Sequence, residues 1–321
     1  MENRDRTEAW RRNDTLEGLL GELSGLLGPA EERLNALDAG AEPLPVVLVV
    51  GPPRSGTTLT MQLLAATGLC AYPTNLLSRF YAAPGIGARI QRLLLDPAMR
   101  FRDELDDLAP APPGFDSKLG KTAGALAPNE FWYFWRRFLP TEELEWLGPR
   151  FAEVDLDGLR AELRSLTAAF DRPFACKGMM LQYDLAAFAR EVPWLVFVHV
   201  ERDLESNAAS LLDARRSFFD DPSRWYSAKP REYAALRELP PEEQVRGQVE
   251  CTNRAIAEAG EALGPERYLH LPYGDLCADP AAFFGDLRGR LVAIAPRLES
   301  ILPPTYTGPL SFRATRQDRR P

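Results

Sequence analysis

The fold is decided by the stretch VVLVVGPPRSGTTLTMQLLA, residues 46–65. It opens with a β-branched run from Val46 to Val50 that a glycine- and proline-rich turn closes, a pattern that predicts a buried parallel strand. Residues 59–65 predict a helix. A strand, a glycine loop and a helix N-terminus together form a cradle for phosphate, because free backbone N–H groups and the helix dipole favour an anion there. The stretch therefore predicts an α/β fold that binds a phosphorylated ligand.

The loop differs from the phosphate-binding loop of a nucleoside triphosphatase at the position of the conserved lysine. Gly51 and Gly56 have the Walker spacing, but Thr57 stands where such enzymes carry a lysine. Arg54 supplies a cation from inside the loop instead, which argues against ATP hydrolysis. The alternative is an ordinary strand-to-helix turn that binds no ligand. In that case the strand, both glycines and the threonine pair would have to occur together by chance.

A second candidate phosphate site follows another apolar strand, Trp194 to Val200. Arg202 comes at the end of this strand and Ser210 lies eight residues later, in a predicted helix. Open α/β sheets bind ligands at the carboxyl ends of their strands, so both residues are expected to face one crevice. An arginine fork and a hydroxyl suit a phosphate monoester. Alone, the pair is equally consistent with helix capping; together with the first loop it predicts a ligand phosphorylated at both ends.

These two sites resemble those of sulfotransferases that use 3′-phosphoadenosine-5′-phosphosulfate (PAPS). Residues 53–58, PRSGTT, resemble the family's 5′-phosphosulfate loop, and the Arg–Ser pair resembles its 3′-phosphate site. Residues 271–276, LPYGDL, resemble a segment whose tyrosine stacks near the adenine, although Gly274 replaces the usual glutamate and the tyrosine could simply pack a strand end. The resemblance runs from about Val46 to Pro280. It implies that the cofactor is held by Arg54, Ser55, Gly56, Thr57, Thr58, Arg202, Ser210 and Tyr273.

The resemblance also implies a catalytic lysine. Lys177 ends a short predicted strand and looks like the family lysine that contacts the transferring sulfuryl group; it is expected at the same sheet edge as Arg202. Many cytosolic sulfotransferases carry a catalytic histidine two positions later, where this chain has Met179. The only two histidines of the sequence, His199 and His270, fall inside predicted strands and are expected in the core rather than as bases.

The general base is therefore expected among the carboxylates. Tyrosylprotein-type enzymes place a glutamate where this chain has Thr74 and Asn75. Glu130 lies in an aromatic run that faintly resembles the surroundings of the catalytic glutamate in heparan-type sulfotransferases. Desolvation by the aromatic rings is expected to raise the pKa of Glu130 toward a useful range. The alternative, a surface glutamate beside a core aromatic stripe, stays open, and Asp116 is a weaker candidate.

Composition narrows the class of protein. A chain of 321 residues can form one large α/β domain, and a net charge of −8 argues against a nucleic-acid surface. Four cysteines without metal spacing, together with the lack of a membrane-spanning run or leader, predict a cytoplasmic protein with reduced thiols.

The chain is expected to divide into N-terminal helices over residues 1–44 and a sulfotransferase domain over residues 45–321. Asp14 is expected to cap the first helix, and the Gly28-Pro29 pair to end it. The larger part is expected to carry a helical and aromatic insertion at about 83–147, with a proline-rich loop, and a lid at about 213–235. The basic residues after Phe312 predict a frayed tail.

The sequence therefore predicts a P-loop-like three-layer sandwich, with a central parallel sheet flanked by helices and with helical insertions. The resemblance implies a PAPS-dependent sulfotransferase of a bacterial small-molecule type, suited to secondary metabolism, that moves a sulfuryl group in line to a hydroxyl. Arg54 would stabilise the leaving group, Lys177 the sulfuryl oxygens, and Glu130 would accept the proton, without a metal. The partner is a small-molecule acceptor, and a homodimer is possible. The alternatives are a P-loop kinase and a non-catalytic nucleotide-binding protein.

Overall fold

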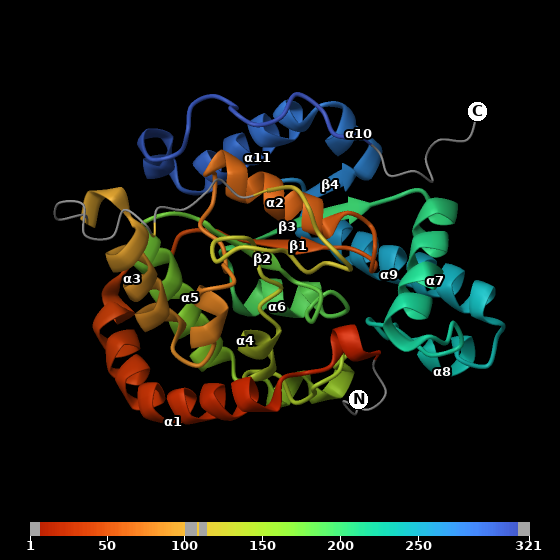
Figure 1. Cartoon of the computed structure of the whole chain (residues 1–321). Helices are drawn as coiled ribbons and strands as arrows, with labels where there is room; N and C mark the ends of the chain where they lie inside the picture. Colours follow the sequence, from red (N-terminus) through yellow and green to blue (C-terminus); the bar gives the residue numbers. More distant parts are fainter. Residues whose placement is uncertain (1–6, 100–107, 109–113, 314–321) are drawn as a thin grey trace.

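A parallel four-stranded sheet lies at the centre of the computed structural model, which describes residues 7–99, 108 and 114–313 (Figure 1). The strand order is β2-β1-β3-β4, so β1 lies in the interior of the sheet beside β2 and β3. Each of the three connections between consecutive strands is a crossover that contains at least one helix, as parallel pairing requires. The strands are β1 (Val46–Val50), β2 (Phe174–Lys177), β3 (Leu195–Glu201) and β4 (Tyr268–Pro272).

Helices account for most of the remaining described chain. Those longer than one turn are α1 (Asp14–Leu37), α2 (Thr57–Thr67), α3 (Pro84–Leu95), α4 (Trp132–Arg136), α5 (Leu156–Phe170), α6 (Leu185–Glu191), α7 (Leu204–Phe219), α8 (Tyr233–Leu236), α9 (Pro241–Leu263), α10 (Tyr273–Ala278) and α11 (Pro280–Ile294). Short 3-10 turns join several of them: η2 (Glu8–Trp10), η3 (Asp38–Gly40), η4 (Leu77–Phe80), η5 (Pro97–Met99), η7 (Gly148–Glu153) and η8 (Pro296–Ser300).

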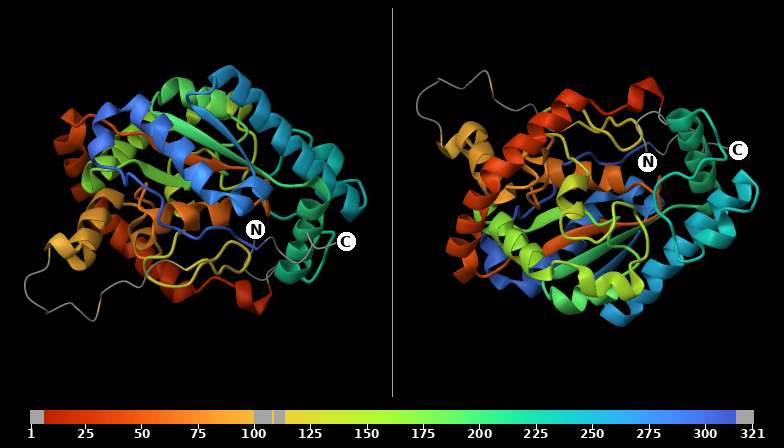
Figure 2. Two further views of the ribbon diagram at one scale, coloured as in Figure 1. Left: turned by 90° about the horizontal axis from the view of Figure 1, so that it is seen from above. Right: turned by 90° about the horizontal axis from the view of Figure 1, so that it is seen from below.

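The sheet is covered on both faces, which explains why its strands are apolar throughout. Side chains of β1 alternate: Val46, Leu48 and Val50 pack toward α4, α5 and α6, whereas Val47 and Val49 pack toward α2, α10 and α11. Viewed from above and below, these two sets of helices lie on opposite sides of the strands (Figure 2). The predicted three-layer arrangement with a central parallel sheet is confirmed.

The N-terminal region differs from its prediction in two ways. Residues 14–37 form one continuous helix through Pro29, and Asn13 rather than Asp14 caps it by accepting from the backbone N–H of Leu16. Pro29 removes one helical hydrogen bond, but packing of the residues after it stabilises the continuous helix. Glu31, two residues later, is buried and accepts from the N–H groups of Gly85 and Ile86 at the start of α3. This tertiary contact outweighs the local helix-breaking signal.

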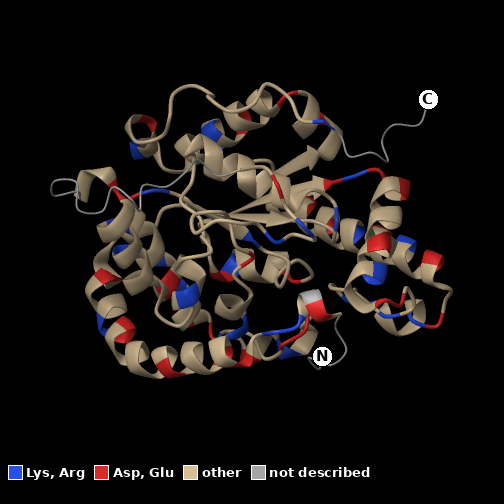
Figure 3. Ribbon diagram, viewed as in Figure 1, with Lys and Arg blue, Asp and Glu red and all other residues tan. Residues whose placement is uncertain are grey.

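Two predicted features fall outside the described residues: the proline-rich loop at 109–113 and the basic tail after Arg313. Acidic and basic residues are mixed along outer helices such as α1 and α7 (Figure 3). Within residues 7–99, 108 and 114–313, no helix is both long and apolar enough to cross a membrane.

Candidate active site

Two positions of the turn between β1 and α2 fit only glycine. Gly51 and Gly56 have φ angles of 152° and 113°, a region that L side chains rarely adopt. A Cβ atom on Gly51 would lie 2.5 Å from the carbonyl oxygen of Val200 in β3, and one on Gly56 would run into the ring of Tyr273. Asn207 of α7 holds the turn from outside, because its side-chain amide donates to the Pro53 carbonyl at 2.7 Å. The loop is thus fixed by β3, α7 and α10 together.

A cavity of about 740 Å³ opens at this carboxyl edge of the sheet. Its size is within the range of small-molecule sites. Nearly all of the predicted site residues border it, and they come from β2, from the loops before α2 and α4, and from the segments after β3 and β4. The predicted residues on its wall are Arg54, Gly56, Thr57, Thr58, Asp116, Glu130, Lys177, Arg202, Ser210 and Tyr273. Ser55 is fully buried, and its Oγ has no hydrogen-bond partner among the described residues.

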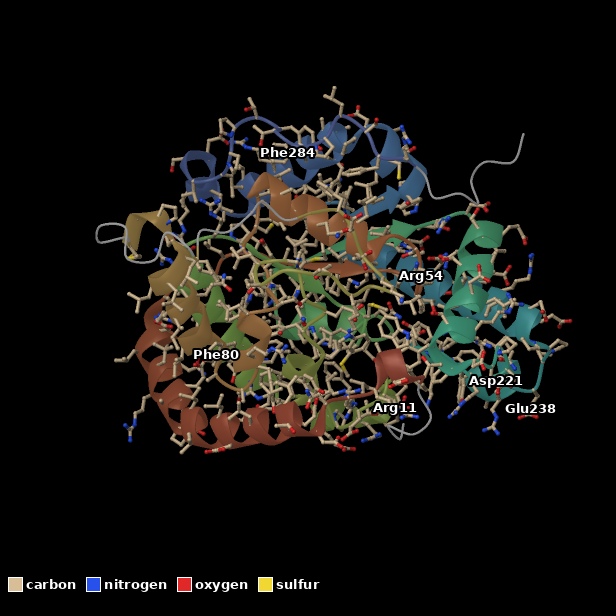
Figure 4. All side chains as sticks on the ribbon, viewed as in Figure 1. Arg11, Arg54, Phe80, Asp221, Glu238 and Phe284 are labelled. Atoms are coloured by element: carbon tan, nitrogen blue, oxygen red, sulfur yellow. The ribbon has the colours of Figure 1, made fainter. Side chains whose placement is uncertain are left out.

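The two predicted phosphate sites touch each other. Arg54, which has a left-handed φ of 72°, lies at the end of the sheet that faces α7 (Figure 4), and its Nε donates to Ser210 Oγ at 3.2 Å. The guanidinium carbon of Arg202 lies 5.1 Å from the centre of the Tyr273 ring, a cation–π contact. The first loop, α7 and α10 therefore form one continuous wall of cationic and aromatic groups.

Glu130 and Lys177 form an ion pair inside the cavity. Lys177 Nζ lies 3.0 Å from Glu130 Oε1 and donates to Thr58 Oγ1 at 2.7 Å. The other carboxylate oxygen, Oε2, accepts from Lys121 Nζ at 2.6 Å and from the Trp132 indole at 2.7 Å. The two side chains predicted to act as the catalytic lysine and the general base are thus in direct contact.

The direction of the Glu130 pKa shift is opposite to the expectation from its aromatic surroundings. Burial would raise the pKa of Glu130, but the ammonium groups of Lys177 and Lys121 and the hydrogen bonds from Lys121 and Trp132 outweigh it and hold the pKa below its ordinary value. Burial also lowers the pKa of Lys177, although Glu130 opposes that shift. The carboxylate is therefore ionised at neutral pH.

A tight turn at residues 118–121 lies against this pair. Lys118 and Lys121 exchange two backbone hydrogen bonds of 2.9 Å, and the residues between them, Leu119 and Gly120, have φ angles of 47° and 84°. Both central residues have the positive φ of a type I′ turn. A Cβ atom on Gly120 would lie 2.7 Å from Glu130 Oε1. Leu119, Gly120, Trp132 and Met179 border the cavity.

Neither histidine borders the cavity, but only one is in the core. His199 is buried, with its ring nitrogens 2.7 Å from the Tyr268 hydroxyl and 3.0 Å from Asn253 Oδ1. Burial lowers the pKa of His199. The expectation of a buried His270 is wrong: β4 is an edge strand, so His270 is exposed and pairs with Glu201 at 2.6 Å. Thr74 and Asn75 make structural hydrogen bonds and do not border the cavity.

Sequence reasoning missed Lys121, Trp132 as a hydrogen-bond donor, and Asn207. The only signal for Lys121 is the Leu-Gly pair between two lysines, which suggests a turn but not what it contacts. Asn207 lies one turn before Ser210 in α7 and could have been proposed from that spacing. Among the residues that the structure describes, no cluster of three or more His, Cys, Asp or Glu side chains could hold a metal ion.

Comparison with known proteins agrees with this arrangement. The sequence profile of the Sulfotransferase family matches residues 45–291. Sulfotransferase STF9 from Mycobacterium avium superposes with a TM-score of 0.52 at 16% identity, over 95% of this chain and 79% of that one. Sulfotransferase STF1 from Mycobacterium tuberculosis H37Rv gives 0.51 at 14% identity, over 83% and 72%. At such low identity, the superpositions show that these proteins share the P-loop-like α/β fold. Among curated proteins, none matches the sequence. Because the family profile covers most of its length, including the loop, both strand ends and Tyr273, the chain belongs to the sulfotransferase family.

Proposed function

We propose that this sulfotransferase moves the sulfuryl group of PAPS to a hydroxyl of a small-molecule acceptor. The observation that carries the proposal is the single cavity in which the β1–α2 cradle, the Arg202–Ser210 wall and the Lys177–Glu130 pair meet. The first two suit the two phosphorylated ends of one nucleotide. The third supplies a cation and a proton acceptor for transfer chemistry.

The residues present fit PAPS. Helix α2 begins at Thr57, directly after the left-handed Gly56, so its first N–H groups lack helical partners and suit an anion. The unpartnered Ser55 Oγ in the same cradle is a further polar group. Arg54, Ser55, Gly56, Thr57 and Thr58 would hold the 5′ end, and Arg202, Ser210 and Tyr273 the 3′-phosphoadenosine end.

When bound, PAPS would supply an electrophilic sulfur, to which the acceptor oxygen bonds as the bond to the 5′-phosphate oxygen breaks and leaves its electron pair on the phosphate. Arg54 would oppose the negative charge that develops on that phosphate. Lys177, already held between Thr58 and Glu130, would stabilise charge on the sulfuryl oxygens. Glu130 would accept the proton of the acceptor hydroxyl.

Two measurements test the proposal against its rivals. Calorimetry should show binding of 3′,5′-adenosine bisphosphate without metal, and weaker binding of ATP with Mg²⁺. Transfer of labelled sulfate from PAPS should be detected with at least one member of a panel of phenols, sugars and alcohols. Tighter binding of ATP with Mg²⁺ would favour a P-loop kinase, and nucleotide binding without transfer to any acceptor would favour a non-catalytic nucleotide-binding protein.

The proposal places the enzyme in the cytoplasm, in a bacterial small-molecule pathway. The four cysteines are free thiols and buried, which suits a reducing compartment. A homodimer is compatible with the proposal, and light scattering at two protein concentrations would test it.

A further inference from the structure

The two oxygens of the Glu130 carboxylate have different surroundings. Oε2 accepts from two donors, the Lys121 ammonium at 2.6 Å and the Trp132 indole at 2.7 Å. Among the described residues, Oε1 accepts only from Lys177, at 3.0 Å. Only 12% of the Glu130 side chain is exposed, so solvent contributes little to either oxygen. Removal of a single contact would therefore free Oε1 and leave Oε2 held.

The residue beside Oε1 is a glycine that borders the cavity. Gly120 is the residue next to this oxygen, and any side chain there would collide with it. The same tight turn sends Lys121 toward Oε2. This turn thus holds one carboxylate oxygen through Lys121 and, by its glycine, keeps side-chain atoms away from the other.

We propose that Lys121 and Trp132 are positioning residues that hold Glu130 by Oε2, so that Oε1 is the oxygen that takes the acceptor proton once Lys177 turns to the sulfuryl group. The inference rests on the proposed function for its chemical meaning, because it assigns the proton of the acceptor hydroxyl to one atom. During this step Lys177 leaves the Glu130 carboxylate for the sulfuryl group. Lys121 keeps the carboxylate in place while Lys177 moves.

Three cations surround this step. Lys177 comes from β2 and Lys121 from the turn at 118–121. The positive charge of Arg54, from the β1–α2 loop, also lowers the pKa of Lys177. Lys121 also opposes protonation of Glu130, because an ammonium beside a carboxylate favours the charged form. It therefore sets the pH below which Glu130 stops working as a base. Its side chain is 55% exposed, so substitution there should be tolerated by the fold.

The test is a pH titration of the Trp132 indole N–H by NMR, since its hydrogen bond to Oε2 makes the signal report the charge of Glu130. Trp132→Phe assigns the resonance among the six tryptophans. Lys177→Met imitates the state in which Lys177 has turned away. In that variant the indole shift should show an inflection, and adding Lys121→Met should move the inflection up by about one pH unit or more.

Lys118 provides the matched control. It lies at the other end of the same turn, and its ammonium faces the Trp10 ring at 5.9 Å instead of Glu130. Adding Lys118→Met to the Lys177→Met variant should leave the inflection in place. The proposal is overturned if the Lys121→Met double variant shows no inflection, shows it at the same pH as Lys177→Met, or moves no more than the Lys118→Met double variant.

A second measurement covers the case in which loss of Lys177 disrupts folding. In otherwise wild-type protein, Lys121→Met should move the acidic limb of the pH–rate profile to higher pH, and Lys118→Met should not. An unmoved limb in Lys121→Met would overturn the assignment. The NMR titration needs neither PAPS nor an acceptor, so the positioning of Glu130 and the proposed sulfuryl transfer can fail independently.

Discussion

In the proposed function, Arg202 is the residue that distinguishes a nucleotide with a 3′-phosphate from one without it. It is buried at the end of β3, beside the ring of Tyr273, and shares the cavity wall with Ser210. A guanidinium in this position suits a 3′-phosphate, which 3′,5′-adenosine bisphosphate has and AMP lacks.

We expect Arg202→Ala to weaken binding of 3′,5′-adenosine bisphosphate by about 2 kcal/mol or more, because a charge-assisted contact is lost. Binding of AMP should change little. Calorimetry with both ligands measures the difference, and an equal loss for the two would remove the 3′-phosphate assignment.

In the proposed reaction, Glu130 is the residue that accepts the acceptor's proton. We expect Glu130→Gln to lower turnover by roughly 100-fold or more, because the amide keeps the shape and loses the proton acceptor. Nucleotide affinity should survive. The acidic limb of the pH–rate profile should disappear, since the folded protein holds the Glu130 pKa below its ordinary value and the wild-type base is lost only at low pH. Near-normal turnover with an unchanged profile would direct attention to Asp116, which also borders the cavity.

At the scale of elements, side chains of α7 and α9 form hydrogen bonds with the segment that follows α7. Arg215 of α7 is fully buried and donates to Gln244 Oε1 at 2.6 Å, Gln248 Oε1 at 3.2 Å and the Pro222 carbonyl at 3.3 Å. Gln248 in turn donates to the carbonyls of Tyr226 and Ala228. The region predicted as a lid is thus tied to α9 by buried hydrogen bonds, and lid motion remains a prediction.

We expect Arg215→Met to destabilise the fold by about 2–4 kcal/mol, because it leaves the buried acceptors of Gln244 and Gln248 without a donor. Burial already lowers the pKa of Arg215 to about 10, which shows how strongly the site desolvates it. Arg216→Met is the control. Its exposed side chain pairs only at the surface with Asp213, and it should change stability by less than about 0.5 kcal/mol. Urea unfolding measures both, and similar losses would contradict the argument.

Whether the sequence predicts a part of the site depends on whether local pattern and sheet pairing, or distant contacts, fix its position. The strand–loop–helix and the ends of β2 and β3 could be predicted, because parallel strands bring Lys177 and Arg202 to one edge whatever the loops do. The turn that carries Lys121 could not, since its place depends on distant contacts such as the Gln62 amide, which donates to the carbonyls of Gly114 and Asp116. For the same reason local signals failed at Pro29, where Glu31 anchors α1 to α3.

At the scale of the whole molecule, the N-terminal helix packs on the core next to buried charge. Arg137 donates to both oxygens of Glu162, at 2.6 and 2.7 Å, and the nearby Glu31 of α1 adds a second negative charge. Burial raises the pKa of Glu162 to about 7, although Arg137 opposes the shift. The docking of α1 is therefore expected to depend on pH.

Glu162 has a folded pKa above its unfolded value of 4.5, so between these values the native state binds a proton that the unfolded state releases. Its contribution to stability is full below pH 4.5 and is lost as the pH rises through about 7. We expect Glu162→Gln to weaken this decline of the unfolding free energy, measured with urea at several pH values. Glu153→Gln, on an exposed side chain, should keep it. Parallel pH curves for Glu162→Gln and the wild type would contradict the assignment.

Leu119 has a left-handed backbone that a leucine adopts at a cost of about 1 kcal/mol, and asparagine would fit that place in the turn better. The protein therefore forgoes stability at a position that borders its own cavity. Leu119→Asn should raise the midpoint of thermal unfolding while changing which acceptors are sulfated. A sequence optimised for thermostability alone would replace this leucine, so we expect the choice of acceptor to limit thermal stability at this turn.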